Sequence, residues 1–462
     1  MDRATIGKKR YSILGAVRSG RAAARLLKKQ GASVFVSDRS PAEKMTEAAA
    51  VLDEIGVQYE FGRNSERVLD ADVLVLSPGV PSQTQIVQEA IAGGVKVVSE
   101  IELASWLCDA PIVAITGTNG KTTTTTLVGR MFEDAKRGCV VGGNIGTAFS
   151  EIVQNVQPQE TVILEVSSFQ LDHIEQFRPK VSVILNVTPD HLDRYEHSLE
   201  RYIESKGRIF MNQGEGDTIV YNYDDPVTRS LVETHAPATV TRLSFSAFEE
   251  QAEGAFVKDR IVYSSLAGVT KEIIPADEVS IHGTHNLYNA MAATLSSQVM
   301  GISVASLRST LKNFKGVEHR LEFVRELDGI TFVNDSKATN VDSVRYALQS
   351  FSAPLIVLLG GRDKGNDYSV LADLIRTHVK AVIAIGESAP KVVDAISGIV
   401  NVIPATSMDE AVRTARAHAR AGEVVLLSPA CASFDWFDNY EHRGNVFKTA
   451  VMNLESQREV TT

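Results

Sequence analysis

Residues 115–123 read Ile-Thr-Gly-Thr-Asn-Gly-Lys-Thr-Thr. The apolar residues 111–116 predict a strand, and residues 124–135 predict a helix. A glycine-rich turn between a strand and a helix brings backbone N–H groups and a helix N-terminus to bear on phosphate oxygens. Lys121 would then reach the terminal phosphates of a nucleotide, and the Thr122 hydroxyl would hold Mg²⁺. The strict phosphate-loop pattern has a glycine where this chain has isoleucine, so an ordinary strand-to-helix turn is the alternative.

Two further predicted strands end in residues that suit a metal-bound nucleotide. Residues 161–164 are apolar and lead to Glu165, and residues 181–185 lead to a polar run that contains His191. The carboxyl ends of parallel strands share one edge of a sheet, so we expect both side chains to face the same crevice as Lys121. A surface acid and a merely hydrogen-bonded histidine are the alternatives.

The chain has 462 residues, which suggests about three domains. Short β-rich runs alternate with helical runs, a pattern typical of parallel sheets with helices on both faces. We expect an α/β protein with domains at residues 1–100, 101–316 and 317–462. The first and third are expected to be Rossmann-like and the second a P-loop-type ATPase domain. Residues 245–280 are less regular and suggest a small antiparallel excursion.

Composition excludes several classes of protein. Hydrophobic residues make up 44% and charged residues 23%, an ordinary globular balance, and the net charge is -10. An acidic chain does not suit nucleic-acid binding or a polybasic membrane surface. Three cysteines allow no disulfide framework, and there is no Cys-x-x-Cys pair for zinc. Without a signal-like or membrane-length apolar run, we expect a cytoplasmic protein with no membrane insertion.

Other loops carry weaker signals. Asn286 and Asn289 are three residues apart and share a helix face that suits a base edge, although a helix N-cap explains them equally well. Three loops of the last segment follow predicted strands and should gather at one edge, which favours an anion or carboxylate site; plain turns are the alternative. The residues that suggest this site are Lys337, Thr339, Lys364 and Ser433.

The first segment also contains a possible nucleotide site. Residues 15–20 read Gly-Ala-Val-Arg-Ser-Gly, and Asp38 ends the second predicted strand. The dinucleotide fingerprint has a glycine where this chain has Val17. These features suggest a nucleotide-like ligand that need not be NAD, with an ordinary turn as the alternative.

Together, these motifs resemble the Mur ligase family over essentially the whole chain. The runs at 117–122, 165–168, 186–193 and 285–289 are similar to motifs shared by several members. The runs Asn-Asp-Ser-Lys-Ala-Thr-Asn at 334–340 and Ser-Pro-Ala-Cys-Ala-Ser at 428–433 resemble the branch that adds D-glutamate. The Asp-Asn-Pro-Arg run that marks relatives adding a diamino acid is absent.

The resemblance implies an ATP-dependent, peptide-bond-forming ligase of peptidoglycan precursor synthesis. Such an enzyme adds D-glutamate to UDP-N-acetylmuramoyl-L-alanine through an acyl phosphate and releases ADP and phosphate. The first domain would bind the UDP-sugar, the second ATP and the third the amino acid, with Mg²⁺ as cofactor and the chain a monomer. A Mur-type ligase that adds another amino acid is the main alternative.

The resemblance also implies roles for individual residues. Lys121, His191 and Lys206 would be catalytic. The metal ligands would be Thr122, Glu165, His191 and, if it carries CO₂ as a carbamate, Lys206; by spacing alone Lys206 looks like a solvated helix lysine. The implied ATP contacts are Gly117, Thr118, Asn119, Gly120, Lys121, Thr122, Thr123, Asn286, Arg320, Asp335 and Lys337. The UDP-sugar contacts would be Ser19, Asp38, Arg39, Ser77, Gly79 and Asn144. The D-glutamate contacts would be Thr339, Lys364, Ser433 and Tyr440.

Three other functions are compatible with parts of the chain. A nucleotide-sugar oxidoreductase would use the first domain for NAD, but Val17 and the loop at Lys121 argue against it. A nucleotide-gated binding protein would have no use for the polar loops of the third domain. Folylpolyglutamate synthase is a more distant relative, because its substrate lacks the uridine diphosphate that the first domain would hold.

Overall fold

The computed structural model describes residues 3–281, 283–351, 353–363 and 365–456. These residues form two compact units. The larger unit contains the described residues up to 279 together with 288–314, and the smaller contains 280–287 and 315 onward. Two sheets belong to the larger unit and one to the smaller.

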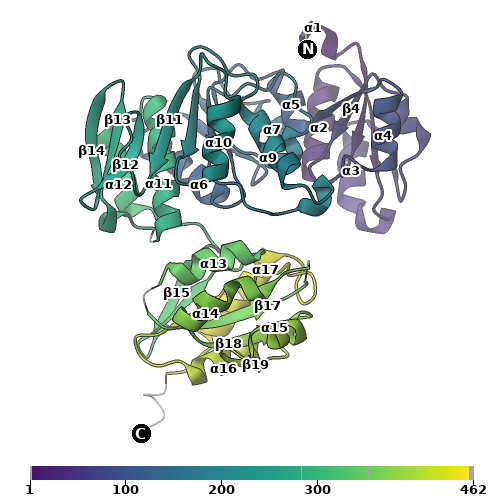
Figure 1. Ribbon diagram of the computed structural model, residues 1–462. Helices are drawn as coiled ribbons and strands as arrows, with labels where there is room; N and C mark the ends of the chain where they lie inside the picture. Colours follow the sequence, from purple (N-terminus) through teal and green to yellow (C-terminus); the bar gives the residue numbers. More distant parts are fainter. Residues whose placement is uncertain (1–2, 282, 352, 364, 457–462) are drawn as a thin grey trace. The chain divides into compact units, whose positions relative to one another are not determined.

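The first sheet is wholly parallel, with strand order β3-β2-β1-β4-β5. Its strands are β1 (Arg10–Leu14), β2 (Ser33–Asp38), β3 (Gln58–Phe61), β4 (Val73–Leu76) and β5 (Lys96–Ser99). The helices of this part are α1 (Arg3–Ile6), α2 (Arg18–Lys29), α3 (Thr46–Glu54) and α4 (Gln85–Ala92) (Figure 1). Strand β3 differs from the others in that its side chains are only partly buried or exposed and form no apolar run.

The second sheet is mixed, with strand order β14-β13-β12-β11-β10-β9-β6-β8-β7. Its parallel part consists of β6 (Ile112–Thr116), β7 (Cys139–Gly143), β8 (Thr161–Glu165), β9 (Val181–Ile184), β10 (Thr218–Asn222) and β11 (Thr241–Ser246). The strands β12 (Gly254–Lys258), β13 (Ile261–Leu266) and β14 (Val269–Pro275) pair antiparallel with one another. The predicted antiparallel excursion is therefore present. The helices are α5 (Glu100–Ser105), α6 (Lys121–Asp134), α7 (Phe149–Ile152), α8 (Ser168–Leu171), α9 (Leu199–Gly207), α10 (Pro226–His235), α11 (Thr284–Val299) and α12 (Val304–Asn313).

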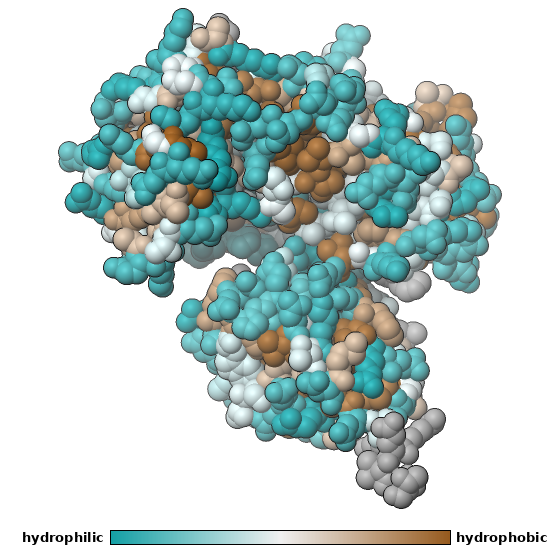
Figure 2. Space-filling view, turned by 180° about the vertical axis from the view of Figure 1, so that it is seen from behind, coloured by the Kyte–Doolittle hydropathy of each residue, from teal (hydrophilic) through white to brown (hydrophobic). Residues whose placement is uncertain are grey.

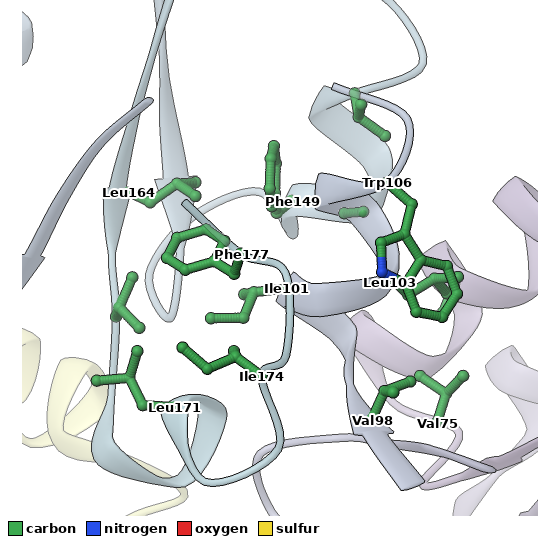
Figure 3. Close-up of a cluster of buried hydrophobic side chains, with 14 of the residues drawn as sticks. Val75, Val98, Ile101, Leu103, Trp106, Phe149, Leu164, Leu171, Ile174 and Phe177 are labelled. Atoms are coloured by element: carbon green, nitrogen blue, oxygen red, sulfur yellow. The ribbon is translucent and has the colours of Figure 1, made fainter. Parts of the chain in front are cut away.

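One continuous apolar core joins the first two sheets. Figure 3 shows Val75 and Val98 of the first sheet on one side of α5 and Leu164 of the second sheet on the other. The carboxylate of Glu102 in α5 is fully buried and accepts hydrogen bonds from the Trp106 indole and from backbone N–H groups. Because this shared core resists shearing, the carboxyl edges of the two sheets keep a fixed relation inside the larger unit.

The third sheet has the order β15-β16-β20-β17-β18-β19 and is parallel apart from β15. Its strands are β15 (Glu322–Leu327), β16 (Ile330–Asn334), β17 (Leu355–Gly360), β18 (Val379–Ile385), β19 (Asn401–Pro404) and β20 (Val424–Leu427). Apolar residues pack on both faces, from α13 (Val341–Gln349), α14 (Ala372–His378) and α15 (Ala389–Ile396) on one and from α16 (Met408–His418) and α17 (Tyr440–Met452) on the other. The α/β fold class, with three mainly parallel sheets flanked by helices, is confirmed.

The face of the protein drawn in Figure 2 is mainly polar. Figure 2 shows a largely hydrophilic face, with hydrophobic residues gathered near the middle of the larger unit and otherwise in small patches. Among the described residues, no helix has both the length and the apolar character that crossing a membrane requires.

Candidate active site

The loop between β6 and α6 is shaped by close packing. Gly120, which directly precedes α6, has a positive φ of 86°. A Cβ atom at this position would lie 2.3 Å from the side-chain oxygen of Asn289, so only glycine fits here. The ammonium group of Lys121 folds back and donates to the carbonyl oxygens of Gly117 and Thr118, each at 2.8 Å. Asn289 itself accepts from the Thr124 hydroxyl and therefore braces this loop.

Glu165 lies beside the first turn of α6. It ends β8, which pairs with β6 so that Glu165 is level with Ile115. Its buried carboxylate accepts from the Thr122 hydroxyl and from the Asn144 side-chain amide, both at 2.8 Å. The structure thus joins Thr122, Glu165 and Asn144 in one hydrogen-bonded row.

Strand β6 lies between β8 and β9, so the loop after β9 is adjacent to the loop between β6 and α6. Hydrogen bonds join these two loops. The Thr118 hydroxyl donates to the carbonyl oxygen of Thr188 and accepts from its N–H, both at 3.0 Å. His191 follows in the left-handed conformation, with φ of 53°. Its Nε2 is 3.7 Å from a carboxylate oxygen of Asp190, and its ring meets the ring of Phe169 edge-on at 5.3 Å. The strand order therefore brings Lys121, Glu165 and His191 to one edge.

The prediction that Lys206 is a solvated lysine is wrong. Its side chain is 1% exposed, and its ammonium group donates to the Gly117 carbonyl oxygen at 2.9 Å, the same oxygen that Lys121 contacts. Burial, reinforced by the nearby Lys121, holds the pKa of Lys206 well below its usual value. The neighbouring Glu204 is exposed, whereas Ser205 and Gly207 are buried with Lys206, so local composition misrepresented the part of α9 that packs inward.

The donors at this edge suit a magnesium-bound nucleotide. No group of three His, Cys, Asp or Glu side chains is arranged to hold a metal within the described ranges. Mg²⁺ usually binds one or two carboxylates and substrate phosphates rather than a complete protein cage. The Thr122 hydroxyl and the Glu165 carboxylate are oxygen donors of that kind, and His191 adds an imidazole nearby.

A cavity of about 650 Å³ opens at the carboxyl edge of the first sheet. All six predicted UDP-sugar contacts line it: Ser19, Asp38, Arg39, Ser77, Gly79 and Asn144. Asp38 also fixes the backbone beside the cavity, because its carboxylate accepts hydrogen bonds from the N–H groups of Ala16 and Ser40 at 2.7 and 2.8 Å. The departure from the dinucleotide fingerprint falls at Val17, which also lines the cavity and is 62% exposed.

Asn144 contacts both the cavity wall and the glutamate beside the loop between β6 and α6. Its side chain binds Glu165 beside the phosphate loop, and its carbonyl oxygen accepts from Arg18 at 3.1 Å on the cavity wall. The cavity and the phosphate loop are therefore neighbours within the larger unit.

In the smaller unit, Asp335 follows β16 and is 6% exposed. Its carboxylate accepts from the Ser428 hydroxyl at 2.9 Å and from the N–H of Leu321 at 3.3 Å. Burial raises the pKa of Asp335 to about 7, although Arg320 and these hydrogen bonds oppose the rise.

Close by, Lys337 places its ammonium nitrogen 5.1 Å from the ring centroid of Tyr440. His285 packs against Tyr346, and burial together with Arg320 lowers the pKa of His285 to about 4, so this imidazole stays neutral. The backbone N–H of Asn286 donates to the Gly283 carbonyl oxygen at the start of α11.

The loops after β16 and β20 are held together by Arg443, which is 1% exposed. Its guanidinium donates to the carbonyl oxygens of Ser336, Cys431 and Ala432. Ser433 and partly buried Thr339 belong to these loops. Lys364 lies outside the described residues.

Comparisons with known proteins identify the family of this chain. Family models described as Mur ligase MurD-like N-terminal domain, Mur ligase middle domain, and Mur ligase, glutamate ligase domain match residues 9–99, 115–297 and 319–431. The UDP-N-acetylmuramoylalanine--D-glutamate ligase of Salinibacter ruber is 50% identical, covering 97% of this chain and 99% of its own length. That of Chlorobaculum tepidum is 44% identical, covering 96% and 97%.

The chain belongs to the Mur ligase family. Solved structures agree in fold. A pseudomurein peptide ligase type C from Methanothermus fervidus superposes with a TM-score of 0.61 at 17% identity, covering 97% of this Mur ligase and 100% of itself. UDP-N-acetylmuramate-alanine ligase MurC from Thermotoga maritima gives 0.58 at 18% identity, covering 96% and 99%.

Two arginines of this Mur ligase escaped sequence analysis. Arg443 stands in an ordinary polar helix pattern, and Arg194 follows the run at 186–193 without a motif of its own. Both are recognisable only from their through-space contacts. Arg194 donates to the carbonyl oxygens of Pro78 and Val80, more than a hundred residues away.

Proposed function

We propose that this chain is the ATP-dependent ligase that joins D-glutamate to UDP-N-acetylmuramoyl-L-alanine. One observation carries the proposal: the hydrogen-bonded row Asn144–Glu165–Thr122 runs from the nucleotide-sugar cavity to the phosphate loop. A substrate anchored by its uridine diphosphate in that cavity would present its free carboxylate beside the γ-phosphate of ATP. The names of relatives at 42–50% identity support this substrate pair.

The reaction needs activation of the carboxylate, because an oxygen anion is a poor leaving group. The carboxylate attacks the γ-phosphorus of ATP, the bond to the β-phosphate oxygen breaks, and ADP leaves an acyl phosphate behind. The amine of D-glutamate then attacks the acyl carbon and expels phosphate. Lys121 is proposed to approach the phosphates and offset the charge that spreads over the transferred group.

Mg²⁺ would supply charge neutralisation between the carboxylate and the polyphosphate. Thr122, Glu165 and His191 are the proposed ligands. The buried amine of Lys206, whose pKa is held well below its usual value by burial, suits reaction with CO₂, which forms an N–C bond, releases a proton and leaves an anionic carbamate at the metal site. A lysine turned into a carboxylate-like ligand would explain a full-length lysine buried next to Lys121.

We propose that residues 1–100 hold the UDP-sugar, 101–316 the ATP phosphates and 317–462 the amino acid. The proposed D-glutamate contacts are Thr339, Lys364, Ser433 and Tyr440, and the remaining ATP contacts are Asn286, Arg320, Asp335 and Lys337. The enzyme is proposed to act as a cytoplasmic monomer.

The test is ADP release measured with Mg²⁺, ATP and UDP-N-acetylmuramoyl-L-alanine against a panel of amino acids. The expected result is release with D-glutamate and much less with L-glutamate, L-alanine, L-lysine or diaminopimelate. Strong turnover with another amino acid would assign the chain to a different step. Release that is independent of any amino acid, with no amide product by mass spectrometry, would remove the ligase assignment altogether.

A further inference from the structure

Arg194 joins the wall of the nucleotide-sugar cavity to the loop that carries His191. It lies in the short 3-10 helix Leu192–Tyr195 and is partly buried. Its guanidinium donates to the carbonyl oxygens of Val80 at 3.2 Å and Pro78 at 3.5 Å, and both residues line the cavity. The side chain of Gln83 returns a hydrogen bond to the carbonyl oxygen of Arg194. Arg194 therefore connects two loops that belong to different sheets.

The flat face of the same guanidinium covers an aromatic ring. Its carbon lies 4.2 Å from the centroid of Phe169. The edge of Phe169 meets the His191 ring at 5.3 Å, and Tyr195 stacks on Phe169 at 6.0 Å. The N–H of Arg194 also donates to the carbonyl oxygen of His191 at 3.0 Å. Arg194 thus supports His191 both through the backbone and through the ring beneath it.

The loop needs such support because its backbone is strained. His191, Glu196 and His197 have φ values of 53°, 53° and 60°, in the left-handed region that costs energy for residues other than glycine. Strained conformations persist only where surrounding contacts over-determine them. Within this loop, Arg194 and Tyr195 make those contacts, and Tyr195 is held in turn by Asp172 and Ser205.

We propose that Arg194 is a positioning residue, which sets the distance between the nucleotide-sugar and the metal-bound phosphate by clamping the Pro78–Val80 wall to the His191 loop. This inference rests on the proposed function. Only arginine can fill this role, because a planar guanidinium stacks through its face while donating through its edge, which an ammonium group cannot do. Loss of the clamp leaves both binding sites present but misaligned.

The test compares Arg194→Met and Arg194→Lys with a matched control, Arg229→Met. Arg229 also stacks on an aromatic ring, 4.7 Å from the centroid of Tyr223, but has no part in the proposed site. In Arg194→Met we expect kcat to fall on the order of 10- to 100-fold, because a misplacement of about 1 Å costs that much. The KM for ATP should change less than about threefold, since the phosphate loop is intact, and Arg194→Lys should recover only part of kcat.

A binding measurement separates positioning from general damage. In the wild type, Mg²⁺ with a non-hydrolysable ATP analogue should tighten binding of UDP-N-acetylmuramoyl-L-alanine in calorimetry, and this coupling should disappear in Arg194→Met. If Arg194→Met fails to fold, Phe169→Leu decides, because it removes the ring and leaves both carbonyl contacts. We expect Phe169→Leu to lower kcat at least fivefold with little change in the nucleotide-sugar KM.

Different results would contradict the proposed function and the proposed role of Arg194. A wild-type chain that neither forms ADP nor binds the nucleotide-sugar would remove the proposed function. The role of Arg194 would be overturned by a different result. In that case the wild type is active, but Arg194→Met matches Arg229→Met in kcat and in coupling. If Arg194→Met does not fold, the same comparison is made with Phe169→Leu.

Discussion

Asp335→Asn should stabilise the smaller unit, increasingly so as the pH rises. In the folded chain Asp335 is 6% exposed and its pKa is raised from 3.8 to about 7, chiefly by burial. The folded state therefore holds the proton more tightly than the unfolded state, and stability is lost as the pH rises from about 4 to about 7. Asparagine has nearly the same shape as the protonated acid and never ionises.

The magnitude follows from that shift. A difference of about three pKa units corresponds to about 4 kcal/mol once both states are ionised. About 2–3 kcal/mol of this develops between pH 5 and pH 8. We therefore expect the advantage of Asp335→Asn over the parent, measured as free energy of unfolding, to grow by that amount across this range.

The two tryptophans make the assay specific. Trp106 belongs to the larger unit and Trp436 packs against the core of the smaller one. In a Trp106→Phe background, urea titrations followed by fluorescence report the smaller unit alone. Asp373→Asn, at a side chain 96% exposed, is the control and should shift stability by less than about 0.5 kcal/mol at every pH. An advantage that stays constant from pH 5 to pH 8, or a loss at pH 8, would refute the reasoning.

Three further outcomes are expected. Lys121→Ala should abolish phosphate release yet leave calorimetric binding of the nucleotide-sugar unchanged, because its ammonium group donates to carbonyl oxygens of its own loop and Lys121 is not among the described residues that line the cavity; weakened binding would contradict this. Arg443→Met should destabilise the smaller unit by at least about 3 kcal/mol in the Trp436 assay, since buried carbonyl groups lose their donor; a change below about 1 kcal/mol would deny its bracing role. Removing dissolved CO₂ should lower wild-type turnover reversibly, with recovery on adding bicarbonate, whereas Lys206→Met should be inactive under both conditions; indifference of the wild type to bicarbonate would speak against a carbamate.

Much of the fold could be predicted from local patterns. Buried parallel strands such as β6, β8 and β9 are rich in apolar residues, and their limits were predicted to within a residue. Strands β3 and β19 carry no such apolar run, because they are only partly buried and contain polar residues. Edge strands of this kind owe their conformation to the neighbour they pair with, and that neighbour is not visible in local sequence.

By itself, the sequence predicted the glycine-rich turn between β6 and α6, the α/β class and the gathering of several polar loops at one edge of a parallel sheet. Those properties depend on short-range requirements, such as glycine at position 120 and the length of an apolar run. Only the tertiary structure decided that Lys206 is buried, that Asn144 links the cavity to Glu165, and that Arg194 clamps two loops. Burial and long-range hydrogen bonds depend on which faces meet after folding, and the spacing of residues along a chain does not specify that.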